Sequence, residues 1–527
     1  MAKKEGSAPP RRAAVINGER PPPPELVFGI VGPIGVKLDG VIPALQEALE
    51  RVGYDSDVIH LTDYMKNSRV KTRLDETSYF SRYMSLIKYA NEYRRLARSR
   101  AALAGIAILQ IRRRRSQQTH SSSTPATKRA YIIRQFKRPE EVDLMRRVYG
   151  RKFIQVSVFG GEQDRREVLV DKIRQHDASP KSEAECEREA IKLMDIDYRQ
   201  SDDPNGQLIE SVFHLGDVFV DGIDLGKASQ TIERFVKAFF GYNRLSPNKD
   251  EYGMYVAAAA SLRSVDLSRQ VGAAIFTQRG EIVAMGCNEV PKPGGGTYWC
   301  DDGSQTYRDI DLGFDANQER RAEIIFDLIE RLAQEGYINQ KKNEASIHST
   351  VDGIIKNERV RDAQIMDIIE FGRMIHAEMS AISDAARLGK AINETYMFST
   401  AFPCHICAKH IVASGIRRVV FLEPYPKSYA RKLHRDAISF DPSAGDKVRF
   451  EPFIGISPRR YRDIFERKRR KDDKGRAVDW YEGSPYPLVE DRGHAYIQLE
   501  ATAAIYAMGS MYGAQPRSAK GASAQED

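Results

Sequence analysis

Residues 395–423 read TYMFSTAFPCHICAKHIVASGIRRVVFLE, and this stretch decides the fold of the second half of the chain. TYMFST and RRVVFLE are short apolar runs with strand character, and the segment between them, residues 404–415, has helical spacing. Another helical segment lies upstream at residues 375–388, and residues 271–286 read as two strands joined by a turn at residues 279–280. Strands and helices in this order predict an α/β/α sandwich.

The sequence before this sandwich has an α/β pattern of its own. The run LVFGIVG, at residues 26–32, reads as a buried strand, and a glycine-rich turn and a helical pattern follow it. The polar, arginine-rich segment 112–130 reads as a long mobile loop. We expect a disordered proline-rich arm, a parallel-sheet domain, the sandwich domain, and a C-terminal extension with a disordered tail, over residues 1–25, 26–246, 247–470 and 471–527.

Composition excludes several classes of protein. Of the 527 residues, 41% are hydrophobic and 29% are charged, which suits folded domains and argues against a disordered chain. No apolar run approaches the roughly 18 residues of a membrane span, and the charged N-terminus lacks the apolar core of a secretory signal. Five cysteines are too few, and odd in number, for a disulfide framework. We expect a cytoplasmic protein whose cysteines bind a metal or are simply buried.

Positive charge is concentrated in one part of the first domain. Residues 82–151 hold 18 basic and 4 acidic residues, an excess larger than the net charge of +8 for the whole chain. This block favours a phosphate-bearing partner, either a regulatory nucleotide or RNA; a solvated basic helix face is the alternative explanation. Four tyrosines interleave with the basic residues, as they would in a groove for single strands, but their spacing suits an ordinary helix face. They are Tyr79, Tyr83, Tyr89 and Tyr93.

Four residues have the pattern of a catalytic metal site. His376 and Glu378 form an HAE sequence, and Cys404 and Cys407 follow in PCHIC. One histidine and two cysteines supply the three protein ligands of a catalytic zinc site, which leaves one tetrahedral position for water. Cysteines three residues apart on a helix face the same side, and the proline before them suits a helix start, whose dipole favours thiolates. The pattern HxE…PCxxC is a known signature of zinc nucleobase deaminases.

Glu378 lies two residues beyond His376, so we expect it beside the metal rather than bound to it. Zinc lowers the pKa of a bound water from 15.7 to about 7. Glu378 would then carry protons from that water to the ring nitrogen and to the departing ammonia. The alternative is a closed structural zinc site, in which His405 or His410 supplies a fourth ligand.

The residues around this constellation resemble the cytidine and deoxycytidylate deaminase superfamily, and its deoxycytidylate branch in particular. The matching segments are SRQVGAAIF, MGCNEVP and the run around the two cysteines. The resemblance implies that Asn288 hydrogen-bonds the sugar and that Phe402 flanks the base. Arg308, in the insertion between residues 291 and 373, and Lys427, after the last strand of the opening stretch, are candidates for contacts with substrate phosphates.

As a whole, residues 25–470 resemble the anti-phage deoxycytidine nucleotide deaminases, which join an N-terminal P-loop kinase-like domain to a C-terminal deaminase. The resemblance implies Zn²⁺-dependent conversion of dCTP, dCMP or both to dUTP or dUMP and ammonia, which depletes the nucleotides of the phage, and assembly as a homo-oligomer. Gly32, Gly35 and Lys37 would bind phosphate in the first domain, although this lysine is displaced by one position from the P-loop pattern. The alternatives are a polynucleotide cytosine deaminase and a sensor that binds RNA or nucleotide.

Overall fold

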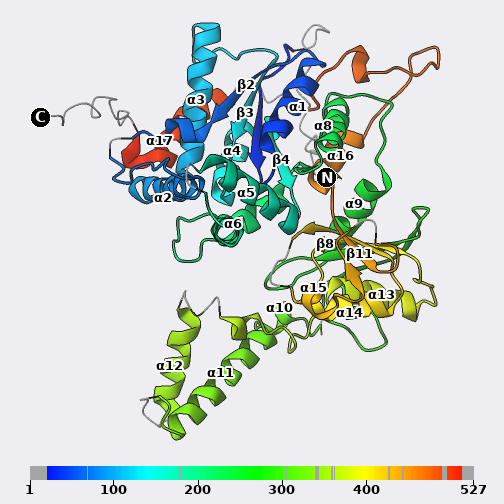
Figure 1. Cartoon of the computed structure of the whole chain (residues 1–527). Coiled ribbons are helices and arrows are strands. Elements are labelled where there is room, and N and C mark those ends of the chain that lie inside the picture. The colour runs from blue at the N-terminus through cyan, green and yellow to red at the C-terminus, as the bar shows by residue number, and fades with distance from the viewer. Residues whose placement is uncertain are drawn as a thin grey trace, which may run out of the picture.

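Two six-stranded sheets organise the chain, one in each half (Figure 1). The computed structural model describes residues 21–512, apart from residues 68, 178–179, 304–305, 339–343, 358–359, 361–362, 425–427, 442–443 and 490–494. Among the residues so described, no helix has both the length and the apolar character that crossing a membrane requires. The predicted α/β class is confirmed for both halves.

The first sheet is parallel except at one edge and has the order β12-β5-β4-β1-β3-β2. Its parallel strands are β1 (Leu26–Val31), β2 (Asp55–His60), β3 (Arg129–Arg134), β4 (Phe153–Phe159) and β5 (Val218–Asp221). The edge strand β12 (Gly455–Ile456) pairs antiparallel with β5. Every residue of β1 is buried, because helices cover both faces of this sheet.

Alternate residues of β1 face two separate hydrophobic cores. Phe28 packs with α1 (Leu38–Glu50) and α8 (Leu225–Phe239) on one face. Val27 packs on the other face with α2 (Tyr79–Ala97), α3 (Ala102–Thr119), α4 (Pro139–Tyr149) and α17 (Ala495–Met508). The other α-helices packed with this sheet are α5 (Glu162–His176), α6 (Glu183–Tyr198), α7 (Ile209–Val212) and α16 (Tyr461–Phe465), whereas α15 (Ala430–Leu433) packs in the core of the second sheet.

The second sheet has the order β10-β11-β9-β8-β6-β7. Its strands are β6 (Gly272–Phe276), β7 (Ile282–Cys287), β8 (Tyr396–Ala401), β9 (Arg418–Glu423), β10 (Ile438–Ser439) and β11 (Val448–Pro452). β6 pairs antiparallel with β7 and β8, and the other pairs are parallel. Helix α9 (Lys249–Ser261) covers one face, and α13 (Ala377–Arg387) and α14 (His405–Ala413) cover the other. The expected sandwich of helices, sheet and helices is present.

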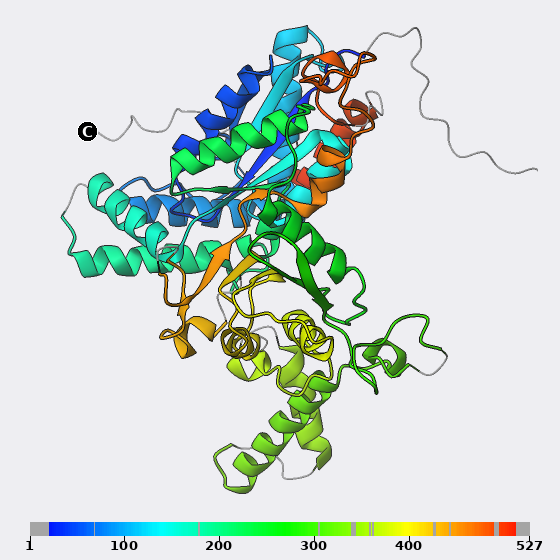
Figure 2. The same ribbon diagram turned by 90° about the vertical axis from the view of Figure 1, so that its right-hand side faces the viewer.

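The insertion between β7 and α13 forms a helical hairpin that projects from the second half (Figures 1 and 2). Its helices are α10 (Asp309–Leu312), α11 (Ala316–Gln334) and α12 (Glu344–Lys356). Three buried residues, Ile325, Ile347 and Val351, form a small core between α11 and α12. The hairpin therefore packs as a unit of its own, separate from the cores of the two sheets.

The chain returns to the first sheet after β11, so the expected end of the sandwich domain at residue 470 was wrong. Strand β12 belongs to the first sheet, although its residues fall within the predicted sandwich domain of residues 247–470. Helix α17, in the segment predicted as a C-terminal extension, packs against α3 of the first half, where a Cβ at Gly105 would lie 2.6 Å from the side chain of Met508. Residues 513–527 of the predicted tail lie outside the described residues.

Two predictions of unstructured segments also need correction. Helix α3 continues through the arginine run to Thr119, where a mobile loop over residues 112–130 had been expected. Glu25, placed in the disordered arm, is only 2% exposed. Residues 1–20 of that arm lie outside the described residues. A run of four arginines looks like a solvent-exposed segment in the sequence, but Arg115 points inward from the helix and is fully buried.

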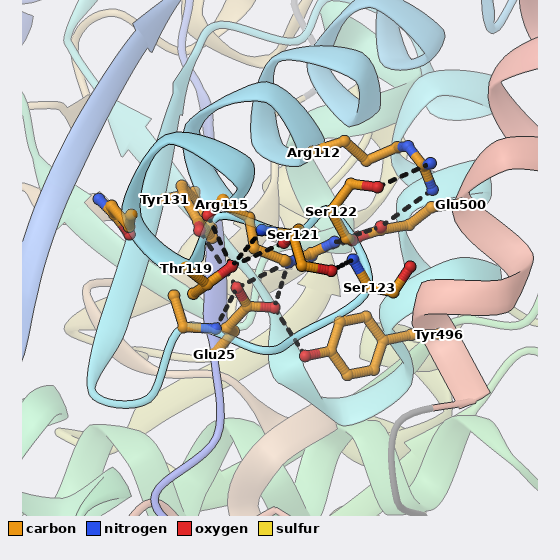
Figure 3. A network of polar contacts seen from close by, with 12 residues as sticks. Glu25, Arg112, Arg115, Thr119, Ser121, Ser122, Ser123, Tyr131, Tyr496 and Glu500 are labelled. Atoms are coloured by element: carbon orange, nitrogen blue, oxygen red, sulfur yellow. Dashed lines mark hydrogen bonds and ion pairs between the residues drawn. The ribbon is translucent and has the colours of Figure 1, made fainter.

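Arg115 lies at the centre of a buried polar network (Figure 3). Its Nε is 2.9 Å from Oε1 of Glu25, and its Nη1 and Nη2 each lie 2.6 Å from an oxygen of Glu500 on α17. Tyr496 donates to Glu25 and Tyr149 donates to Glu500, at 2.6 and 2.9 Å. Two buried carboxylates thus share one guanidinium, and this network joins the start of the first sheet to the C-terminal helix.

Replacing Arg115 with methionine is expected to lower the free energy of unfolding by about 3 to 5 kcal/mol, because it removes the buried guanidinium that two buried carboxylates share and leaves Glu500 only the longer 3.8 Å ion pair with Arg112. Urea denaturation followed by circular dichroism measures this change. The control is Arg113→Met, since Arg113 is exposed on the same helix and should shift stability by no more than about 0.5 kcal/mol. Equal stability of the two variants would show that the network does not hold α17 in place.

The two halves share a continuous core. Phe219 of β5 contacts Phe453, which follows β11, with ring centroids 5.8 Å apart. Glu251 near the start of α9 is fully buried and accepts hydrogen bonds from Arg234 of α8, at 2.7 Å, and from the backbone N–H of Ile456, at 3.1 Å. The chain passes between the halves twice, from α8 to α9 and from β11 to β12, and Glu251 bonds to residues beside both passages.

Candidate metal centre and catalytic site

Two helices of the second half begin at the same place. His376 immediately precedes α13 and Cys404 immediately precedes α14, so each is the N-cap of its helix. Cys407 lies in the first turn of α14, and its backbone N–H donates to Sγ of Cys404 at 3.5 Å. A backbone bridge between Ile375 and Glu289 fixes where α13 begins. Two helix N-termini therefore converge on one position, as the sequence predicted.

The three side chains are close enough to share one ion. Nδ1 of His376 is 3.3 Å from Sγ of Cys404 and 3.3 Å from Sγ of Cys407. All three ligand atoms lie within 4.8 Å of one another. Zinc–ligand distances of about 2.0 to 2.3 Å at tetrahedral angles would separate nitrogen from sulfur by about 3.5 Å. The donor set and its spacing therefore fit a zinc ion.

A fourth protein ligand is absent from this cluster, as far as the described residues extend. His405, one of the two alternative fourth ligands, has its Nε2 3.4 Å from a carboxylate oxygen of Glu370 instead. His410 lies in the last turn of α14, whereas the ligands lie at the start of that helix. A three-ligand cluster leaves a coordination position for water or substrate, which is the arrangement of a catalytic rather than a structural zinc site.

The two thiols of the cluster differ in acidity. Hydrogen bonds from Cys407 and from the ring of His376 lower the pKa of Cys404 to about 4. The pKa of Cys407 is raised, because its thiol bonds to Cys404 and because it is buried. The hydrogen bond to Cys404 also raises the pKa of His376. A divalent cation binding here would displace the protons that these groups share.

Glu378 lies beside the three ligands, in the first turn of α13. It is 3% exposed, and its Oε1 accepts a hydrogen bond from Oγ of Ser399 at 3.0 Å. Its Oε2 accepts from the thiol of Cys407 at 3.4 Å, so this oxygen is on the ligand side. Burial raises the pKa of Glu378. A raised carboxyl pKa suits a group that both takes up and releases protons near neutral pH.

Strand β7 approaches α13 so closely that one position requires glycine. A Cβ added at Gly286 would lie 2.3 Å from the carbonyl oxygen of Ala377 and 2.4 Å from the backbone nitrogen of Ala381. Both alanines are fully buried in the core between α13 and the sheet. This close packing holds the helix that carries His376 and Glu378 directly against β7.

Two predicted substrate residues flank this site in the chain, and both are buried. Asn288 is 6% exposed; its Oδ1 accepts from the N–H of Val271 at 2.7 Å, and its Nδ2 donates to the carbonyl of Arg269 at 2.8 Å. One N–H of this amide remains for a sugar hydroxyl. Phe402 is 8% exposed and packs in an aromatic cluster. The rings it contacts belong to Phe421, Phe440 and Phe450. Contact of either residue with substrate stays a prediction.

Of the two residues predicted to contact substrate phosphates, Arg308 lies among the described residues and Lys427 does not. Nε of Arg308 lies 2.9 Å from a carboxylate oxygen of Asp311, within the insertion. Lys427 lies outside the described residues. Their roles toward substrate phosphates stay predictions.

The glycine turn after β1, residues 32–37, lies between a strand and the N-terminus of α1, as predicted. Gly35 has a φ of +95°, which favours glycine. The backbone N–H of Ile34 donates to the buried carboxylate of Asp197 at 2.7 Å, and the ammonium of Lys37 donates to a backbone carbonyl at 3.1 Å. A carboxylate of this chain thus already occupies one amide of the turn, and nucleotide binding by Gly32, Gly35 and Lys37 stays a prediction.

Sequence reasoning did not single out Ser399, which the structure places against Glu378. The available signal was a serine, followed by a threonine, in an otherwise apolar strand shortly before the PCHIC sequence. A polar side chain at a buried strand position needs a hydrogen-bond partner, and the strand itself does not say which.

Comparisons with known proteins concern the second half of the chain. A family model described as "Cytidine and deoxycytidylate deaminase zinc-binding region" matches residues 247–423. A deoxycytidylate deaminase of Enterobacteria phage T4 is 30% identical over 175 residues, which cover 33% of this chain and 78% of that protein. One of phage T2 is 48% identical over 54 residues, or 10% of this chain and 29% of that protein. A crystal structure of a dCMP deaminase from the cyanophage S-TIM5, in apo form, has 17% identity and a TM-score of 0.21, covering 40% of this chain and all of that one.

Proposed function

The chain belongs to the cytidine and deoxycytidylate deaminase family, and from this premise we propose that it deaminates free deoxycytidine nucleotides. The reaction would convert dCMP, dCTP or both, with water, to dUMP or dUTP and ammonia. The matched family region is a zinc-binding one, and His376, Cys404 and Cys407 form its candidate ligand set, so Zn²⁺ is the cofactor.

A buried carboxylate beside a three-ligand cluster is the observation that carries this proposal. Bound zinc supplies Lewis-acid activation, which lowers the pKa of water to about 7. Glu378, with Oε2 on the ligand side, takes a proton from the attacking water and gives it to the ring nitrogen of cytosine. It then moves the second proton of the water to the departing amine, which leaves as ammonia while the oxygen stays on the ring carbon.

Free nucleotides, rather than polynucleotides, are the substrates that two observations favour. The T4 and T2 relatives are deoxycytidylate deaminases. In addition, part of the basic block at residues 82–151 is used inside the protein. Arg94 is fully buried and lies 2.8 Å from Glu141, and Arg115 is buried between its two carboxylates. These arginines cannot line a groove for a nucleic-acid strand.

The substrate is tested by incubating the zinc-loaded protein with dCMP, dCTP, cytidine, single-stranded DNA and RNA, and by following ammonia and the uracil product. We expect turnover of dCMP, dCTP or both. A Glu378→Ala protein purified in parallel controls for contaminating deaminases. Conversion confined to DNA or RNA would overturn the proposal in favour of a polynucleotide deaminase.

We further propose that this reaction depletes deoxycytidine nucleotides in defence against phage. Cells that express the wild-type protein should lose dCTP during infection and restrict phage growth, and cells that express Glu378→Ala should do neither. Equal restriction by both proteins would separate any defence function from deamination.

A further inference from the structure

Strand β8 presents one hydroxyl to the layer that contains the catalytic helices. Met397 packs in the core with α13 and α14, whereas Phe398 packs in the opposite core with α9. Because strand residues alternate between faces, Ser399 shares the face of Met397. It is fully buried, and its cross-strand neighbours are Ala273 of β6 and Phe421 of β9. Ser399 is therefore a polar side chain in an apolar layer.

The hydroxyl of Ser399 has a specific partner. Its Oγ donates to Oε1 of Glu378 at 3.0 Å, and Glu378 is itself 3% exposed. A hydroxyl buried without a hydrogen bond is costly, so this pairing accounts for a serine at a position where the alternation of the strand calls for an apolar residue. The acceptor is the carboxylate that the proposed reaction uses, and not a backbone group.

The bond gives the two carboxylate oxygens different surroundings. Oε1 is held by β8, and Oε2 is left 3.4 Å from Sγ of Cys407. The last torsion of a glutamate side chain is broad, and without Ser399 the long 3.4 Å contact with Cys407 would be the side-chain bond left to restrain it. We infer that Ser399 is a positioning residue, which fixes the Glu378 carboxylate with Oε2 toward the metal ligands. This inference rests on the proposed deaminase function.

Its test is Ser399→Ala, which removes a single oxygen and leaves the size of the side chain almost unchanged. Misplacing a catalytic group by about 1 Å can cost on the order of 100-fold, so we expect kcat to fall by about 10- to 100-fold. KM for dCMP or dCTP, zinc content and melting temperature should stay near wild type. A merely structural role would instead lower the melting temperature or the zinc content without this selective loss of kcat.

The matched control lies one residue further along the same strand. The Thr400 hydroxyl accepts a hydrogen bond from the backbone N–H of Gly272 at 3.0 Å, so Thr400→Val also removes a hydroxyl from β8. Its kcat should stay within about threefold of wild type. Adding Ser399→Ala to Glu378→Gln should cause no further loss of kcat, because the hydroxyl acts through a carboxylate that Glu378→Gln has already removed.

The outcomes separate this inference from the function on which it rests. A zinc-loaded wild-type protein that deaminates no cytosine compound would overturn the proposed function. An active wild-type enzyme with an unchanged kcat in Ser399→Ala would overturn only the positioning role. A loss of kcat in Ser399→Ala, with full zinc content and an active Thr400→Val, supports both.

Discussion

Turnover is expected to fall by about a thousandfold when Glu378 is replaced with glutamine, while zinc stays bound. Glutamine keeps the size of the side chain and can still accept the hydrogen bond from Ser399, but it cannot take up a proton. Because Glu378 is not one of the three ligands, the cluster of His376, Cys404 and Cys407 remains complete. Steady-state ammonia release and metal analysis of the same protein sample measure the two quantities together.

The control for this variant is Glu370→Gln. Glu370 is another carboxylate near the cluster: it lies 3.4 Å from His405, its side chain is 49% exposed, and its ion pair is with His405 rather than with a ligand. Its removal should leave kcat within about threefold of wild type. If Glu378→Gln also retained its turnover, the proton-transfer role would be wrong. If Glu378→Gln lost zinc, its carboxylate would have to be regarded as support for the ligands.

The ligands of the candidate site could be predicted because their determinants are local. The spacing of Cys404 and Cys407 and the proline before them place both sulfurs at one helix start, and His376 precedes a second helix. The apolar strands β7 and β8, which precede α13 and α14 in the chain, complete the alternation of strands and helices that predicted the sandwich. Asn288 was predicted to contact the sugar, and its bonds to residues 269 and 271 could not be read from the sequence, since they join separate segments.

The errors in the fold arise from contacts between residues far apart in the chain. Arg115 is separated from Glu500 by 385 residues, and without that partner the arginine run looks like a solvated segment rather than the end of a buried helix. Strand β12 has two residues, too few for a hydrophobic pattern, and its membership in the first sheet depends on β5. Ser399 illustrates the same limit at the site, because its partner Glu378 lies on another element.

Replacing Cys404 with alanine is expected to remove both the zinc and the activity. Two ligands remain, and loss of even an outer-shell partner typically lowers metal affinity by about 10- to 100-fold, so loss of a ligand should cost more. After dialysis, the zinc content of the variant should fall close to zero, and ammonia release should be undetectable. Chelation of the wild-type protein should give the same inactive state.

The decisive measurement is whether added zinc restores turnover, because a misfolded protein and a folded protein without zinc are both inactive. Zinc added back to the chelated wild-type protein should restore its turnover, whereas zinc added to Cys404→Ala should not. Cys300→Ala is the matched control: Cys300 is an exposed cysteine outside the cluster, so this variant should retain zinc and activity. If Cys404→Ala bound zinc as tightly as wild type, the metal would have to sit elsewhere, and the role of Glu378 beside it would lose its basis.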